Sequence, residues 1–138
     1  MSKTMQISLR PGEKIYINGG VLRVDRKVTL ELLNDVTFLL ESHVMQVEDT
    51  TTPLRQLYFV AQAILVDPVN AATARTLFFQ QLAALFGSFS NQTVLLALDG
   101  VAQLMEGGRT FEALRTLRAL FPIEDEILGR GVQPPRAA

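Results

Sequence analysis

The side chains best suited to chemistry are cations and one tyrosine close to the start of the chain. A tyrosine ring can stack on an unpaired base while neighbouring cations hold phosphates. This pattern predicts a candidate RNA-binding surface, although a solvated strand face with scattered cations would leave the same residues. The candidate contacts are Arg10, Lys14, Tyr16, Arg23, Arg26 and Lys27.

The charges are unevenly distributed along the 138 residues. Thirteen Lys and Arg stand against fourteen Asp and Glu overall, but residues 1–30 alone carry a local balance of plus four. Residues 31–54 then carry five acidic residues and no basic one. A net basic segment is the minimum electrostatic requirement for binding phosphates, so any nucleic-acid contact is expected in the front part of the chain.

Catalytic groups are scarce. The chain has no cysteine and one histidine, His43, which excludes thiolate chemistry and a multi-histidine metal site. It contains neither a phosphate-binding glycine loop with its Lys and Ser or Thr, nor a GxSxG nucleophile motif. Glu124, Asp125 and Glu126 are consecutive, which favours an acidic helix start stabilised by the helix dipole over a convergent site. We therefore expect no enzyme activity, no cofactor and no metal.

The elements that would position the cations are short strands. Alternating or β-prone runs predict strands over 5–10, 14–17, 21–24, 28–33 and 36–41, with a turn at residues 18–20. This spacing favours a small antiparallel sheet or barrel-like unit of four or five strands. Residues 28–41 also fit one amphipathic helix. Period-two alternation places Tyr16 on the solvent face with Lys14 and Asn18.

Helical periodicity takes over after residue 50. Thr52 followed by Pro53 is a helix-start signal for a helix over 53–66, and Asn91 caps a later helix over 93–106. Further helices are predicted over 71–88 and 110–120, with a short final turn over 122–128 that begins at Pro122. The prediction is an α+β fold: a β unit over 1–49, a bundle of four to five helices over 50–128 and a disordered tail over 129–138, in one compact fold.

Two phenylalanines are candidates for contact with a protein partner. Phe78 and Phe79 are adjacent and point about 100° apart on a helix, so one of them can be exposed. With Phe89 nearby, Phe79 indicates a hydrophobic contact surface, and a wide buried helix face is the alternative. No window approaches the roughly 20 apolar residues of a membrane-spanning helix, so we expect a soluble cytoplasmic protein.

Several runs resemble the FlbT family of flagellar regulators. They lie at residues 7–13 (ISLRPGE), 17–19 (ING), 21–27 (VLRVDRK), 52–58 (TPLRQLY), 111–115 (FEALR) and 118–124 (RALFPIE), and the resemblance covers residues 5 to about 128. It implies a post-transcriptional regulator that acts on the 5′ untranslated region of flagellin mRNA and controls its translation or stability, as a repressor or an activator. It also implies a partner, the small flagellar regulator FlaF.

Other readings of the same chain stay open. Residues 10–17 show a weaker resemblance to the CsrA-type RNA-binding regulators, but residues 36–41 lack the basic residue of that family's last strand. The main alternative function is an adaptor or chaperone-like partner of FlaF or flagellin, with an indirect effect on mRNA. An unpaired edge in so small a sheet favours a homodimer.

Overall fold

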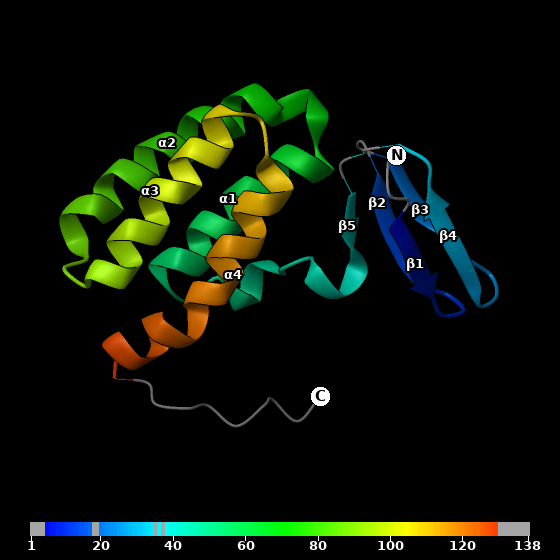
Figure 1. Cartoon of the computed structure of the whole chain (residues 1–138), viewed down its shortest axis with the longest axis horizontal. Coiled ribbons are helices and arrows are strands. Elements are labelled where there is room, and N and C mark those ends of the chain that lie inside the picture. The colour runs from blue at the N-terminus through cyan, green and yellow to red at the C-terminus, as the bar shows by residue number, and fades with distance from the viewer. Residues whose placement is uncertain (1–4, 18–19, 35, 37, 130–138) are drawn as a thin grey trace.

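The fold is α+β, with a β unit beside a bundle of four helices (Figure 1). The computed structural model describes residues 5–17, 20–34, 36 and 38–129. The expected turn at Asn18 and Gly19 and the tail over 130–138 lie outside these residues. The strands are β1 (Met5–Leu9), β2 (Lys14–Ile17), β3 (Gly20–Arg23), β4 (Val28–Leu32) and β5 (Phe38–Leu40).

The strands form two small antiparallel sheets. One sheet pairs β1 with β4, and the other has the order β3-β2-β5. The sheet alternative is therefore confirmed over the barrel-like one in the described part of the chain. The prediction of strands within 28–41 is also confirmed, because Val28–Leu32 and Phe38–Leu40 are both β-strands.

Alternation along β2 sends its side chains to two different cores. Ile15 is fully buried with Ile7, Leu9 and Phe38 in a small cluster between the two sheets. Tyr16 is half-buried on the opposite face of the sheet, where it packs against the helical core. The expectation that Tyr16 faces solvent is wrong, since the bundle covers that face of β2.

The four helices are α1 (Pro53–Val66), α2 (Ala71–Ser88), α3 (Gln92–Glu106) and α4 (Thr110–Ile127). Short 3-10 turns are η1 (Glu41–His43), η2 (Val47–Asp49) and η3 (Pro68–Asn70). Both expected caps are confirmed: the Thr52 side chain accepts a hydrogen bond from the Arg55 amide, and Asn91 accepts one from Val94. Such caps satisfy amides that have no partner inside the helix.

The last helix differs from the expectation. We predicted a break at Pro122 and a separate acidic turn, but α4 continues through Pro122 to Ile127. A proline inside a helix removes one backbone donor and normally costs stability. Here tertiary contacts of the residues after Pro122 keep the segment helical, as the buried Glu124 shows. The acidic residues 124–126 therefore lie near the C-terminus of α4, where the dipole of that helix does not stabilise negative charge.

Besides Tyr16, residues of β5 and of the segment after it join the β unit to the bundle. The ring of Phe38 in β5 lies 5.0 Å from that of Phe111 in α4. The buried Gln62 amide of α1 forms two hydrogen bonds with the backbone of Met45, at 2.6 and 2.9 Å. The Gln62 amide thus supplies the backbone of Met45 with the donor and the acceptor that a neighbouring strand would otherwise provide. The Tyr58 hydroxyl donates to the His43 carbonyl at 2.7 Å, so the connecting segment is fixed along α1.

Within the described residues, no single helix is long and apolar enough to cross a membrane. The segments Pro53–Val66 and Pro68–Ser88 together have a suitable length and composition, but they are bent by 112° at their break.

Candidate functional site

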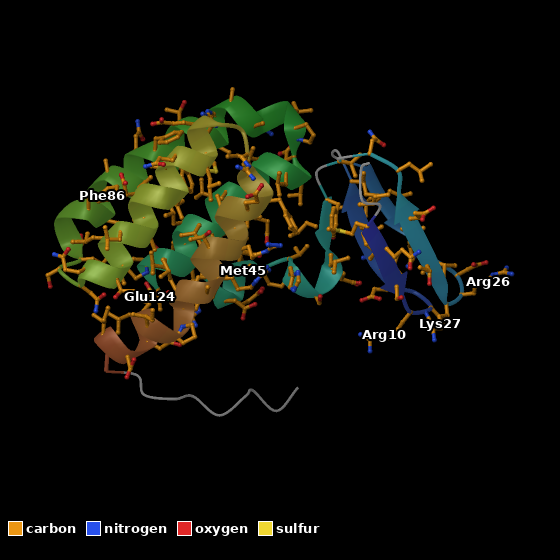
Figure 2. All side chains as sticks on the ribbon, in the orientation of Figure 1. Arg10, Arg26, Lys27, Met45, Phe86 and Glu124 are labelled. Atoms are coloured by element: carbon orange, nitrogen blue, oxygen red, sulfur yellow. The ribbon has the colours of Figure 1, made fainter. Side chains whose placement is uncertain are left out.

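Strand topology brings five of the candidate cations to one end of the β unit. Leu9 pairs with Val28, so Arg10 after β1 lies beside Lys27 before β4. In the other sheet, Lys14 pairs directly with Arg23. Figure 2 shows Arg10, Arg26 and Lys27 together at the turns of this end, remote from the helical bundle. We call these five residues the basic end: Arg10, Lys14, Arg23, Arg26 and Lys27.

Two carboxylates partly neutralise the basic end. Arg26 forms a two-pronged pair with its neighbour Asp25, at 3.0 and 3.1 Å, and this contact lowers the pKa of Asp25. Glu13 accepts a hydrogen bond from the Arg10 amide at 2.9 Å, whereas its contact with the Arg10 guanidinium is 4.0 Å long. Both pairs involve exposed arginines, so water screens them and an anionic ligand can compete for the guanidinium groups.

A rigid turn separates two open hollows at the basic end. Gly12 has a φ of +81°, which favours glycine, and its amide donates to the Val24 carbonyl at 2.7 Å. One hollow of about 460 Å³ is lined by Arg10, Pro11, Gly12, Glu13, Glu41 and Ser42. The other, of about 340 Å³, is lined by Gly12, Arg23, Val24 and Asp25. An arginine therefore borders each hollow.

The remaining sequence candidate of the β unit is Tyr16. It shares a strand with Lys14, but its ring packs against the helical core. The structure thus groups the five cations and places the aromatic ring at the junction with the helices. Alternation in the sequence shows that Tyr16 lies on the face of β2 opposite to Ile15. It does not show that the helical bundle covers this face.

Neither candidate phenylalanine of the helical half is freely exposed. Phe79 is half-buried, and the Arg75 guanidinium lies 5.1 Å from its ring centre. The Arg75 guanidinium also donates to the Met105 carbonyl at 2.6 Å, which holds it in place. Phe89 is half-buried and lines a hollow of about 380 Å³ together with both apolar and polar residues. The lining is Pro53, Ser88, Phe89, Ser90, Asn91, Ile127 and Leu128.

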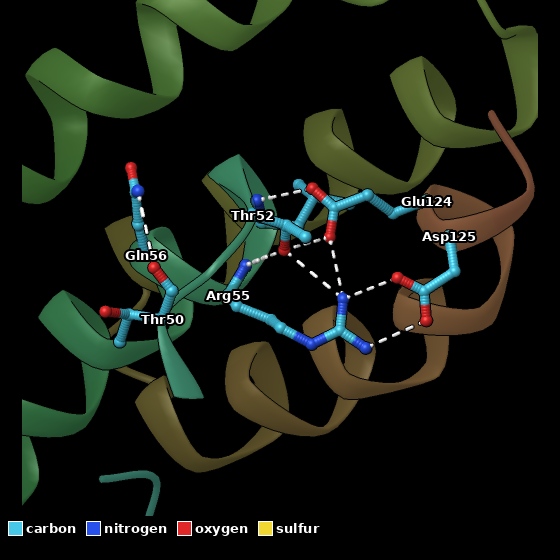
Figure 3. A network of polar contacts seen from close by, with 7 residues as sticks. Thr50, Thr52, Arg55, Gln56, Glu124 and Asp125 are labelled. Atoms are coloured by element: carbon cyan, nitrogen blue, oxygen red, sulfur yellow. Dashed lines mark hydrogen bonds and ion pairs between the residues drawn. The ribbon is translucent and has the colours of Figure 1, made fainter. Parts of the chain in front are cut away.

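A buried polar network links the start of α1 to the end of α4 (Figure 3). Glu124 is fully buried and accepts hydrogen bonds from the Thr52 hydroxyl at 2.5 Å and the Leu54 amide at 2.7 Å. Arg55 lies 3.3 Å from Glu124 and forms a two-pronged pair with Asp125, at 2.8 and 3.0 Å. The carboxylate thus caps the N-terminus of a different helix, where negative charge is favoured.

Burial shifts the pKa of three groups near α1. It raises the pKa of Glu124, although the bonds from Thr52 and Leu54 and the Arg55 charge oppose the shift. It also raises the pKa of Tyr58 and lowers that of His43, which the Arg118 charge lowers further. Among the described residues, no group of three or more histidine, aspartate or glutamate side chains could hold a metal ion.

Comparison with known proteins gives the class of the chain. The family model described as "Flagellar protein FlbT" matches residues 5–128, which span both the β unit and the helices. The chain therefore belongs to this family of flagellar proteins, and the resemblance seen in its sequence is confirmed.

Its relatives have a more particular name. A protein of Brucella ovis named "Probable flagellum biosynthesis repressor protein FlbT" is 57% identical over 129 residues, which cover 93% of this chain and 85% of that protein. A protein of Brucella anthropi with the same name is 56% identical over 125 residues, which cover 91% and 82%. No solved structure matches the chain.

Proposed function

We propose that this protein is a non-catalytic regulator of flagellin synthesis that binds the 5′ untranslated region of flagellin mRNA through its basic end. By this contact it controls translation or stability of the message. The single observation that carries the proposal is the convergence of Arg10, Lys14, Arg23, Arg26 and Lys27 at one end of the β unit. The flagellar role is supported by the names of the relatives.

The physical basis is phosphate binding beside open hollows. Five cations there face the partly engaged carboxylates of Glu13 and Asp25 and the Glu41 carboxylate that lines the hollow beside Arg10. The excess of cations leaves a net positive charge for a nucleic acid backbone. The hollows beside Arg10 and Arg23 are open and partly polar, which suits an unpaired nucleotide more than a rigid duplex. Tyr16 is half-buried, so stacking on its ring contributes little to this proposal.

The test is a titration of the purified protein with a flagellin leader RNA and with a scrambled RNA, each at several salt concentrations. We expect the double variant Arg10→Ala/Arg23→Ala to bind the leader more weakly. Each lost phosphate contact reduces the slope of log affinity against log salt by about 0.7 for a single strand, so the double variant should lose roughly 1.4.

The matched control removes the same charge from the helical half. Arg109 and Arg115 are exposed on or just before α4, and Arg109→Ala/Arg115→Ala leaves the basic end intact. Equal slopes for the wild type and the Arg10/Arg23 variant would contradict the proposed surface. Equal losses in both double variants would show binding governed by overall charge.

The hollow around Phe89 favours a second candidate function, that of an adaptor for FlaF or flagellin. Its rim includes Ile127 and Leu128, both exposed large apolar side chains, which an apolar side chain of a partner helix could cover. Leu128→Glu should then abolish co-purification with FlaF and leave RNA binding unchanged. If RNA binds only when FlaF is present, the adaptor function becomes the better account.

A further inference from the structure

β3 is an edge strand of the described three-stranded sheet. β3 pairs with β2 on one side, and within the described residues no strand pairs with its other side. All four residues of Gly20–Arg23 are exposed, including Val21 at 57% and Leu22 at 49%. Proteins usually protect such edges with lysine, proline or a bulge. Here only Arg23, at the end of the strand, carries a charge.

The hydrogen-bond pattern shows which groups of β3 point outwards. The Val24 amide donates to the Glu13 carbonyl, and the Val24 carbonyl accepts from the Gly12 amide, so Val24 bonds towards β2. Directions alternate along a strand in an antiparallel ladder. Leu22 therefore also bonds towards β2, whereas the amides and carbonyls of Val21 and Arg23 point away from it.

The inner face of the sheet is incompletely covered at the same edge. Leu22 pairs with Ile15, so both side chains lie on the face that meets the other sheet. Ile15 is fully buried there, but Leu22 remains half-exposed and outside the cluster formed by Ile7, Leu9, Ile15 and Phe38. This small cluster and the side chains packed against it come mostly from β1, β2, β4 and β5 and include no residue of β3.

We propose that β3 forms the interface of a homodimer by antiparallel pairing with β3 of a second copy. Leu22 faces Leu22 of the second copy at the two-fold axis, and Val21 faces Arg23 of the second copy on both sides of the axis. In this register the outward groups of Val21 and Arg23 bond to one another. Leu22 occupies a non-hydrogen-bonded pair, where opposing side chains come closest.

A second copy fits this edge because the edge is self-complementary. In a two-fold interface the same strand supplies both sides. The residues at the axis are uncharged, and each Arg23 lies opposite a valine, so no like charges are directly paired. The two half-exposed leucines cover one another on the open inner face. Since the strand has only four residues, association is expected to depend on concentration.

Cysteine cross-linking tests the register, because the chain has no cysteine of its own. Cα atoms of a non-hydrogen-bonded pair lie about 4.5 Å apart, within the range of a disulfide. Leu22→Cys should therefore form a disulfide-linked dimer rapidly under mild oxidation. Val21→Cys places its two sulfur-bearing residues two positions out of register, about 8 Å apart, and should link slowly.

The control is Thr29→Cys, an exposed residue on the polar face of β4 that the proposed interface leaves free. Its linking rate measures random collisions. If Leu22→Cys links no faster than Thr29→Cys, or Val21→Cys links as fast as Leu22→Cys, the proposed pairing is wrong.

Charge variants at Val21 give an independent measurement by analytical ultracentrifugation. Val21→Glu places a carboxylate opposite Arg23 of the second copy, and Val21→Lys places a cation there, twice in each dimer. We expect the dimer dissociation constant to fall at least about twofold for Val21→Glu and to rise at least about twofold for Val21→Lys. Equal circular dichroism spectra would show that both variants fold.

The dissociation constant should change in opposite directions for the two variants. A general loss of apolar surface would weaken the dimer in both. Shifts in the same direction for both variants would overturn the proposal. So would a wild-type protein that stays monomeric over the whole concentration range.

Discussion

Removing the Glu124 carboxylate should destabilise the protein strongly. Glu124→Ala leaves the buried Thr52 hydroxyl and Leu54 amide without their acceptor, while Arg55 keeps its pair with Asp125. A hydrogen bond to a charged group is worth about 1.5–3 kcal/mol, and breaking a buried charged network costs about 3–5 kcal/mol. The cost of burying the charged carboxylate offsets part of the stabilisation that these hydrogen bonds provide. We expect the free energy of unfolding to fall by about 3 kcal/mol.

The assay is urea denaturation followed by circular dichroism, with Asp125→Ala as the matched control. Asp125 shares the same arginine, but no backbone amide or hydroxyl depends on it and Arg55 keeps its contact with Glu124, so its loss should cost less, about 1–2 kcal/mol. The linear dependence of free energy on urea gives both values in one set of experiments. Equal costs for the two variants, or a cost below about 1 kcal/mol for Glu124→Ala, would refute the role of Glu124 as the cap of α1.

The pH dependence of stability gives a second check on Glu124. Its pKa is raised in the folded protein above the ordinary value of 4.5, so the folded state holds the proton more readily than the unfolded state. Its contribution to stability is thus fully present below pH 4.5 and declines as pH rises through the raised pKa. The Gln side chain of Glu124→Gln does not titrate. The excess free energy of unfolding of the wild type over this variant should therefore shrink as pH rises through this window. A difference that grows with pH would contradict the direction of the shift.

Three further predictions concern the junction between the β unit and the helices. The pKa of His43 is lowered, so wild-type stability should decline as pH falls below about 6.5, and His43→Gln should remove this decline in urea midpoints measured across pH. Gln62→Leu leaves both Met45 backbone groups unpaired, which should cost about 1–3 kcal/mol and accelerate hydrogen exchange at the Met45 amide. Phe111→Ala removes the contact with Phe38 and should cost about 3 kcal/mol in the same urea assay, whereas Phe86→Ala, at an exposed ring, should cost much less.

Local patterns in the sequence were sufficient for most of the elements. The start of α1 after Thr52 and its end before Pro68 follow from the chemistry of caps and prolines, which acts within a few residues. Alternation of apolar and polar residues identified the strands, because it too is a pattern within a few consecutive residues. The continuation of α4 through Pro122 could not be seen, because it depends on contacts between residues about 70 positions apart.

The candidate site was predictable in part. Sequence alone indicated a basic front segment, but the meeting of Arg10 with Lys27 and of Lys14 with Arg23 requires the strand register. The burial of Tyr16 depends on a second layer, the helices, that alternation does not report. The role of Glu124 was missed because three consecutive acids look like a surface feature. The only local indication was Thr52 at the start of a helix, and its hydroxyl could bond to many different acceptors.

The aromatic contact between Phe38 and Phe111 also bears on how the chain folds during synthesis. All five strands leave the ribosome before α4 is made, yet Phe38 and Tyr16 complete their packing only against the helices. At a synthesis rate of about 5–20 residues per second, the nascent strands wait several seconds for Phe111. During that interval their apolar faces and the free edge of β3 are open to other chains. A ribosome-bound chain that ends before α4 is therefore expected to be the most aggregation-prone form of this protein.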